Sequence, residues 1–180
     1  VLPVRHLAKD GCLMAVIEAI ATTYLEADAA SVTFSSIPAT YEHLRLSGNA
    51  RYAASGALNN WLIEFNGSGG TAYSTHTMQG YGSSTAAKRY TGSATIIISS
   101  QIHGGNMVTA EYCPLVLEIL DYANTNKNTT CTTFGNGQNR LGFGSGLWDS
   151  TAAVNAIELS SAGGSLLRGS EFTLYGLNSA

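Results

Sequence analysis

Apolar and polar residues alternate in short runs along most of the chain, and Gly, Asn and Ser separate the runs. In residues 43–47, for example, Leu44 and Leu46 fall on one face, whereas His43 and Arg45 fall on the other. A period of two indicates a half-buried β-strand. This pattern predicts strands in residues 31–37, 43–47, 61–65, 73–79, 94–100, 114–120, 129–134, 140–148, 153–159 and 171–177.

About ten short strands at this spacing, rich in β-branched and aromatic residues, are typical of an all-β sandwich or barrel. The most apolar runs, residues 94–100 and 114–120, are expected at the centre of a sheet. The dipeptide Asn66-Gly67 predicts a tight turn after the strand that contains Trp61. A chain of 180 residues normally forms one domain, and at this length it can bury a core without disulfides or metals.

Residues 14–28 fit two structures. Val16, Ile20 and Tyr24 have the spacing of one helix face, and the Ala and Glu content leans towards a helix. The alternating positions from Ala15 to Ala21 fit a strand equally well. The residues alone leave both alternatives open.

Charged residues make up only 12% of the chain, about half the usual ~25%, and uncharged polar residues replace them. Such a surface has little charge repulsion between copies and suits a protein that packs against neighbours. The net charge is −3, and no run of Lys and Arg exists, so no nucleic-acid partner is expected. No apolar stretch reaches the ~20 residues of a membrane-spanning helix, so no membrane partner is expected either.

No arrangement of residues indicates an active site, a cofactor or a metal. Ser145 lies between two glycines, but the GxSxG spacing and a following helix are missing. Residues 80–85 lack the Lys and the helix of a phosphate-binding loop, so a surface loop is the preferred interpretation. The candidate carboxylates for glycoside hydrolysis lie at strand positions, where a polar outer face explains them: Glu64, Glu118 and Asp121. The four histidines have no spacing typical of metal ligands: His6, His43, His76 and His103.

Three cysteines, Cys12, Cys113 and Cys131, have no CxxC spacing. Buried free thiols are the preferred interpretation, and pairing of Cys113 with Cys131 stays open. The Asn- and Thr-rich residues 121–130 fit a solvated hairpin loop better than a sugar or calcium site, because the acidic spacing of an EF-hand is absent.

Several segments resemble uncharacterised structural proteins of tailed bacteriophages. The most specific are Leu-Trp-x-x-Thr-Ala-Ala at residues 147–153 and Phe-Thr-Leu-Tyr-Gly at residues 172–176, and residues 31–46, 63–82 and 119–130 contribute further matches. The resemblance implies an antiparallel, jelly-roll-like β-sandwich located in the virion, as a capsid cement (decoration) protein or a tail-associated protein. It supplies no catalytic residues.

The proteins that the chain resembles begin near Met14 and enter a strand directly, which favours a strand over residues 15–25. We therefore expect an N-terminal arm at residues 1–13 and a β-sandwich domain at residues 14–180. The arm is predicted to lie on a neighbouring subunit or on the shell protein through Val1, Leu2, Pro3, Val4, Arg5 and Leu7. Structural roles are expected for Pro38, Tyr41, Trp61, Trp148, Phe172 and Tyr175.

The first hypothesis is thus a capsid cement protein that stabilises the phage shell through contacts between subunits. Its expected partners are the major capsid protein or tail proteins and further copies of itself, with a trimer as the first expectation. The alternative is a tail or fibre module that binds host-surface glycan through exposed aromatic side chains, with Tyr73, Tyr81 and Tyr90 as candidates. A small hydrolase is the least favoured interpretation.

Overall fold

The computed structural model describes residues 16–53, 58–104, 111–137 and 140–179, without the side chains of residues 58, 99–101 and 103. The predicted arm, with Val1, Leu2, Pro3, Val4, Arg5 and Leu7, lies outside the described residues. The described residues form no helix and twelve strands: β1 (Val16–Tyr24), β2 (Ser31–Phe34), β3 (His43–Ala50), β4 (Leu58–Phe65), β5 (Tyr73–Tyr81), β6 (Ser84–Ser93), β7 (Ile96–His103), β8 (Cys113–Leu120), β9 (Thr129–Gly137), β10 (Arg140–Trp148), β11 (Ile157–Ser161) and β12 (Glu171–Asn178).

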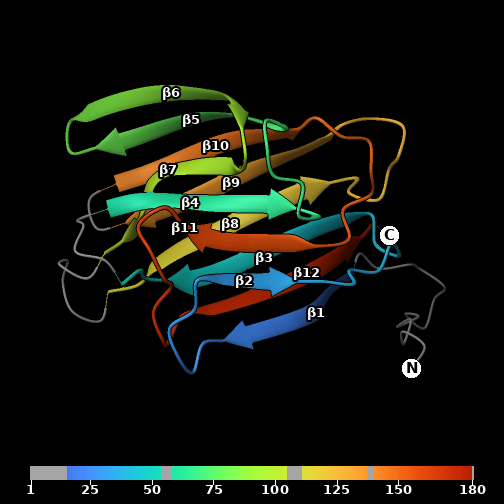
Figure 1. Ribbon diagram of the computed structural model, residues 1–180, viewed down its shortest axis with the longest axis horizontal. Helices are drawn as coiled ribbons and strands as arrows, with labels where there is room; N and C mark the ends of the chain where they lie inside the picture. The colour runs from blue at the N-terminus through green and yellow to red at the C-terminus, as the bar shows by residue number, and fades with distance from the viewer. Residues whose placement is uncertain (1–15, 54–57, 105–110, 138–139, 180) are drawn as a thin grey trace, which may run out of the picture.

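The strands form two antiparallel sheets that pack face to face (Figure 1). The large sheet has the order β1-β12-β3-β8-β9-β10-β5-β6, and the small sheet has the order β2-β11-β4-β7. The predicted antiparallel, jelly-roll-like β-sandwich is confirmed. Of the two alternatives for residues 14–28, the strand is right over the described residues Val16–Tyr24 and the helix is wrong, because β1 pairs with β12 along its length, with one bulge between Ala19 and Ala21.

Two details of the strand prediction are wrong. Residues 80–85 are not a surface loop, because the end of β5, a turn at Gly82 (φ 53°) and the start of β6 occupy them. The run at residues 94–100 corresponds to β7, which lies at an edge of the small sheet rather than at its centre. Ile96, Ile98 and Ile102 are buried nevertheless, because β7 packs on β10, β9 and β5 of the larger sheet.

The core lies between the sheets, where alternate residues of each strand point inwards and are buried. Trp61 of β4 meets Phe172 of β12 edge to face, with ring centroids 6.0 Å apart. At the other end of the core, Trp148 stacks on Tyr73 and contacts Phe65 at 5.8 Å between centroids. These aromatic contacts join the two sheets, since Trp61 and Phe65 belong to the small sheet and the other three residues to the large one.

The loop between β2 and β3 is anchored to the large sheet by two tyrosines. The Tyr122 hydroxyl donates a hydrogen bond to the Pro38 carbonyl oxygen, and the Tyr41 hydroxyl donates to Glu18 Oε2 at 3.1 Å. The Tyr41 ring lies over Gly176, where an added Cβ would come within 2.4 Å of three ring carbons. Burial, together with the hydrogen bond to Glu18, raises the pKa of Tyr41 above its usual range.

Cys113 and Cys131 are buried thiols rather than a disulfide pair, whereas Cys12 lies outside the described residues. Burial raises the pKa of the Cys131 thiol to about 12. The reactive form of a thiol is the thiolate, which is scarce at neutral pH for such a group.

We expect Cys131 to resist alkylation by iodoacetamide at pH 8 in the folded protein and to react fully after unfolding in urea. Peptide mapping by mass spectrometry would separate its modification from that of the other two cysteines. Rapid labelling of Cys131 in the native protein would contradict the buried position.

Candidate ligand-binding face of the large sheet

The outer face of the large sheet, which points away from the small sheet, carries a row of polar side chains across seven strands. The antiparallel register places one such residue of each strand opposite the next. Directly opposed positions on neighbouring strands hold their side chains close enough to interact. In order across the sheet from β12 to β6, the row consists of Tyr175, Arg45, Glu118, Thr132, Ser145, His76 and Arg89.

One half of this row is neutralised by an ion pair. The Arg45 guanidinium donates through Nε to Glu118 Oε1 at 3.0 Å, and its Nη2 contacts the same oxygen. Both side chains are about 40% exposed. Arg45 is therefore already engaged, and this part of the face presents little net charge to a ligand.

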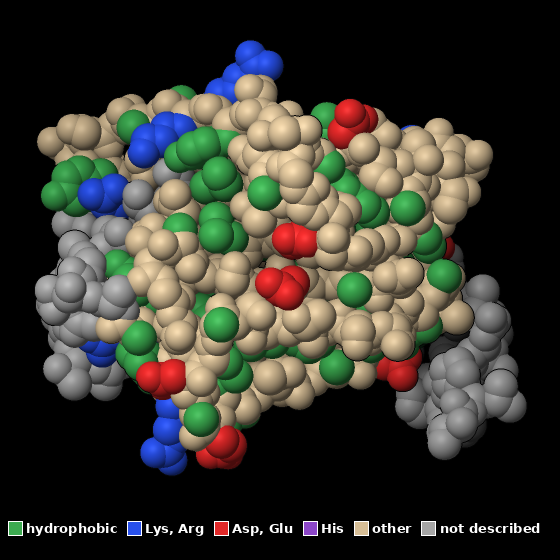
Figure 2. Space-filling view, in the orientation of Figure 1, with side chains coloured by type: hydrophobic (Ala, Val, Ile, Leu, Met, Phe, Trp, Pro, Cys, Tyr) green, Lys and Arg blue, Asp and Glu red, His purple; other side chains and the backbone are tan. Residues whose placement is uncertain are grey.

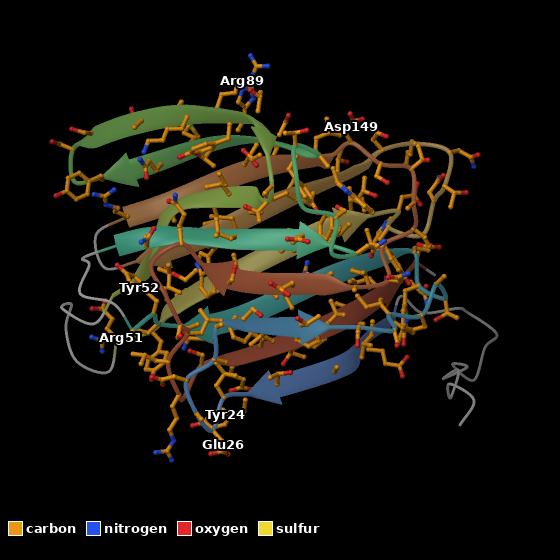
Figure 3. All side chains as sticks on the ribbon, viewed as in Figure 1. Tyr24, Glu26, Arg51, Tyr52, Arg89 and Asp149 are labelled. Atoms are coloured by element: carbon orange, nitrogen blue, oxygen red, sulfur yellow. The ribbon has the colours of Figure 1, made fainter. Side chains whose placement is uncertain are left out.

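The other half of the row carries positive charge without a compensating acid. Arg89 projects from edge strand β6 (Figure 3) and lies opposite His76 of β5. Both side chains are exposed, and within the described ranges neither takes part in an ion pair. The printed sequence has no Asp or Glu in β5, β6, β9 or β10. Arg89 is thus available to an anionic group from solvent.

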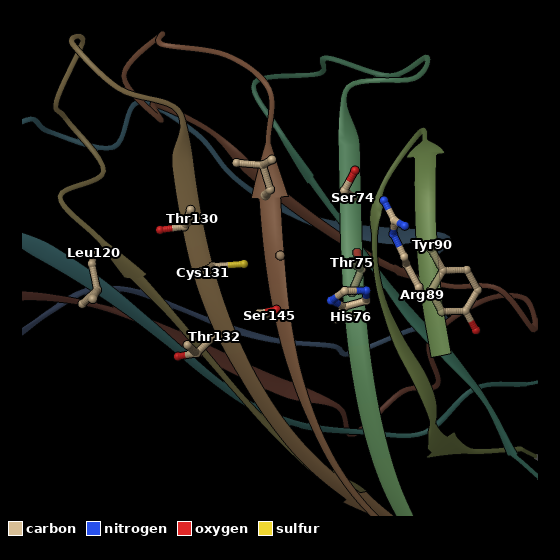
Figure 4. Close-up of a pocket in the computed structure, with 12 residues that line it drawn as sticks. Ser74, Thr75, His76, Arg89, Tyr90, Leu120, Thr130, Cys131, Thr132 and Ser145 are labelled. Carbon is tan, nitrogen blue, oxygen red and sulfur yellow. The ribbon is translucent and has the colours of Figure 1, made fainter. Parts of the chain in front are cut away.

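Two adjoining hollows open on this half of the face, and Arg89, His76 and Ser145 line both of them. The first, of about 520 Å³, continues along the strands to Ser74 and Thr130. Figure 4 shows the labelled side chains of this hollow spread over neighbouring strands, with Ser145 and His76 near its middle and Arg89 towards the β6 side. The polar groups are hydroxyls, an imidazole and a guanidinium, a set that can hydrogen-bond several oxygens at once.

The second hollow, of about 580 Å³, leads to an apolar cluster on the same face. Phe134, Phe143 and Met78 lie opposite one another on β9, β10 and β5, one row beyond the polar one. The two phenylalanine rings are 5.0 Å apart between centroids. Each of these side chains keeps a substantial exposed fraction, as does Leu141 in the next row: 37% for Phe134, 48% for Phe143, 58% for Met78 and 43% for Leu141.

Two glycines of β10 leave room for closely packed neighbours beneath this site. A Cβ at Gly144 would come within 2.5 Å of Thr133 Oγ1 on the adjacent strand β9. A Cβ at Gly146 would come within 2.7 Å of Cys131 Sγ on β9 and within 2.9 Å of two carbons of Ile96, which belongs to the small sheet. These inner positions alternate along β10 with the outer positions of Phe143 and Ser145.

The residues for which a structural role was predicted lie in three settings. Trp61, Trp148 and Phe172 are buried in the core. Pro38 and Tyr41 lie in the loop between β2 and β3 described above. Tyr175 is half-buried on the outer face of the large sheet, at the β12 end of the polar row.

The tyrosines suggested for glycan binding are not brought together on one surface. Tyr73 is buried, and its hydroxyl donates to the Phe65 carbonyl oxygen, so it is an incorrect candidate for a ligand contact. Tyr81 is exposed beneath the Arg140 guanidinium, whose carbon lies 4.3 Å from the ring centroid. Tyr90 is half-buried and lines the first hollow. The exposed aromatic residues that do meet are Phe134 and Phe143.

The residues considered for catalysis are largely separated. Glu118 pairs with Arg45, whereas Glu64 lies on the small sheet opposite Glu158. Asp121 accepts a hydrogen bond from Lys127 Nζ at 2.6 Å, which lowers the pKa of its carboxyl group. Because Asp121 and Lys127 both belong to residues 121–130, this contact stabilises the loop from within.

The structure does bring Ser145 and His76 together, at opposed positions of β10 and β5. Neither strand carries a carboxylate that could orient the imidazole as in a Ser-His-Asp triad. Within the described part of the chain, no cluster of three or more His, Cys, Asp or Glu residues is arranged to hold a metal ion. The same residues contain no helix suited to crossing a membrane.

No protein-family model matches the chain, and no curated protein matches it. Solved structures with a similar arrangement of strands include galectin LEC-6 of Caenorhabditis elegans, with 10% identity, a TM-score of 0.37, and coverage of 87% of this chain and 95% of that one. The alginate lyase vAL-1 from a Chlorella virus has 10% identity, a TM-score of 0.32, and coverage of 96% and 87%. The alginate lyase Aly36B, in complex with an alginate tetrasaccharide, has 10% identity, a TM-score of 0.28, and coverage of 88% and 79%. These likenesses concern the fold alone.

Proposed function

We propose that this chain is a structural protein of a virus particle that binds neighbouring virion proteins through the outer face of its large sheet. The observation that carries the proposal is the exposed apolar cluster of Phe134, Phe143, Met78 and Leu141. Contiguous exposed apolar surface on a folded domain marks an interaction site. The resemblance of residues 147–153 and 172–176 to phage structural proteins supports the same assignment.

The sparse surface charge supports packing into a dense array. Figure 2 shows few charged side chains over the face that it presents, most of them well apart. A specific protein interface buries roughly 1,600 Å² in total, and repetition of one contact around a shell multiplies its effect. We propose a cement or decoration role on the capsid, as a homo-oligomer with a trimer as the first expectation. In this role the chain adds interface area and catalyses no reaction.

The proposal predicts that the protein is a stoichiometric component of purified particles of the virus that encodes it. Quantitative mass spectrometry against the major capsid protein would give the copy number. Hundreds of copies would support a shell position, and a few to a few dozen would support a tail position. Absence of the protein from intact particles would overturn the proposal.

The same measurement tests the outer face. Replacing both Phe134 and Phe143 with serine should reduce the copy number about tenfold or more, because buried aromatic side chains are common hot spots of interfaces. Ile17→Ser is the matched control, since Ile17 is 60% exposed on β1 at the far edge of the same sheet. Equal incorporation of both variants would show that attachment uses another surface.

A second candidate function is a tail or fibre module that binds host-surface glycan. The hollow lined by Ser145, His76 and Arg89 favours it, because hydroxyls and cationic donors lie beside exposed Phe143 and Met78. Sugar-binding sites combine such polar donors with an apolar surface, as ligand sites do in general.

A further inference from the structure

We propose that the hollow centred on Arg89, His76 and Ser145 binds an acidic polysaccharide, one whose sugars carry carboxylate or sulfate groups. This inference deepens the glycan-binding candidate by naming its ligand class and its contact residues. It rests on the glycan-binding candidate and is tested on the isolated domain, where no neighbouring virion protein covers the outer face of the large sheet.

The first observation that supports this proposal is the uneven distribution of acidic residues in a protein whose net charge is negative. The net charge is −3, yet residues 65–110 and 122–148 contain no Asp or Glu. These two stretches are distant in sequence, and they supply β5, β6, β9 and β10, which lie side by side in the large sheet. Arg89 lies in the outer row at the hollow, whereas Lys88 and Arg140, opposite Thr77 and Tyr81, alternate with that row and belong to the other side of these strands. Arg89 thus places a positive charge at the hollow, on strands that carry no acid to compensate it, despite the sign of the whole chain.

The second support is the contrast between two arginines of the same row. Arg45 is held by Glu118, whereas Arg89 is exposed and has no ion-pair partner among the residues described. A guanidinium presents parallel N–H groups that match the two oxygens of a carboxylate or a sulfate. His76, directly opposite Arg89, supplies a further ring nitrogen on the same side of the sheet.

The third support is the surface on either side of this pair. Towards β9 and β10, the exposed hydroxyls of Ser145, Thr132 and Thr130 can exchange hydrogen bonds with sugar hydroxyls. Along the strands, Phe143 and Met78 offer an apolar surface for the C–H groups of a sugar ring. Successive rows on a strand lie roughly 7 Å apart, so the hydroxyl, cationic and apolar groups meet one ligand within a short span. A small anion would use only part of this set.

The test is binding of the isolated full-length chain to three polymers, measured by isothermal titration calorimetry at fixed salt. The probes are polygalacturonate, which carries carboxylates, dextran sulfate, which carries sulfates, and uncharged dextran. We expect binding to at least one acidic polymer and at least about tenfold weaker binding to dextran, because charge-assisted hydrogen bonds supply much of the affinity. The acidic polymer that binds identifies the group.

Arg89→Gln and His76→Gln should each weaken binding of the acidic polymer, Arg89→Gln by about tenfold. The matched control is Arg168→Gln, which removes the same charge from an exposed side chain in the loop between β11 and β12. It should change the affinity less than about twofold, since charges beyond the Debye length are screened. All three positions are exposed, so the unfolding midpoints should stay unchanged and confirm folded variants.

Three results with the polymers and the variants would overturn the inference: failure of every polymer to bind, equal binding of dextran, and equal loss of affinity in Arg168→Gln. A single-stranded DNA oligonucleotide that binds as tightly as the acidic polymer, with the same dependence on Arg89, would also overturn it, by showing a site for any polyanion. None of these results affects the virion proposal, because the copy number in particles is measured without any polysaccharide.

Discussion

Replacing Trp148 with alanine is expected to lower the free energy of unfolding by about 3–5 kcal/mol, the usual cost of removing a large aromatic side chain from a core. Trp148 is only 2% exposed, although it follows the glycine-rich run at residues 142–146. Its ring stacks on Tyr73 and meets Phe65 edge to face. The substitution would leave a cavity between β10 and the small sheet that the surrounding strands cannot close.

Urea unfolding followed by circular dichroism would measure this loss. Phe143→Ala is the matched control, because it removes an aromatic ring from the exposed face of the same strand and should change stability far less. Trp148→Phe should recover part of the loss by refilling most of the cavity. An unchanged midpoint in Trp148→Ala, together with lost binding to particles, would show instead that Trp148 is a contact residue.

Gly48→Ala is expected to destabilise the fold by about 1–3 kcal/mol, through overpacking rather than through a cavity. The ring of Phe172 covers Gly48 from the neighbouring strand, and an added Cβ would lie 2.4 and 2.8 Å from two of its carbons. Phe172 is fully buried and packs against Trp61, so it cannot move aside without disturbing the core.

Gly80→Ala provides the comparison, since Gly80 also lies in a strand of the large sheet and an added Cβ would meet nothing within 4 Å. Alanine also loses less conformational entropy than glycine when the chain folds into a strand, so Gly80→Ala should have a neutral or slightly stabilising effect. The two variants, measured by the same urea titration, separate the clash at Gly48 from the general effect of removing a glycine. Equal midpoints for both would contradict the covering role of Phe172.

Alternation was sufficient to predict most strands because one face of each is buried and one is exposed. It missed β6, whose residues Ser84 to Ser93 are almost all exposed and include no Val, Ile, Leu or Phe. As an edge strand beyond the small sheet, β6 has no apolar face to reveal. The apolar residues of β7 led to the opposite error, the prediction of a central strand. β7 lies at an edge of the small sheet, but the large sheet packs over it and buries most of its apolar side chains.

The candidate site could not be predicted from spacing, since it depends on the register of strands that are distant in sequence. By sequence spacing alone, Ser145 and Glu118 are separate candidates for catalysis and His76 is a candidate metal ligand, and only the pairing of β8, β9, β10 and β5 places them in one row. One signal was present in the sequence, namely the absence of acids from residues 65–110 and 122–148. This absence of acids indicates a basic surface only once the strands of the two stretches are known to lie side by side in one sheet.

The position of β6 also bears on how copies can crowd together without aggregating. The unpaired backbone groups of an edge strand can template a strand from another molecule, and natural sheets prevent this with charges and bulges. β6 has both: Lys88 and Arg89 near its middle, and an extra residue, Gly92 (φ 62°), where its register with β5 shifts. Two such edges that approached each other would bring like charges together. The charges and the bulge of β6 therefore disfavour pairing between two β6 edges of different copies, so contacts between copies through β6 would not extend the large sheet.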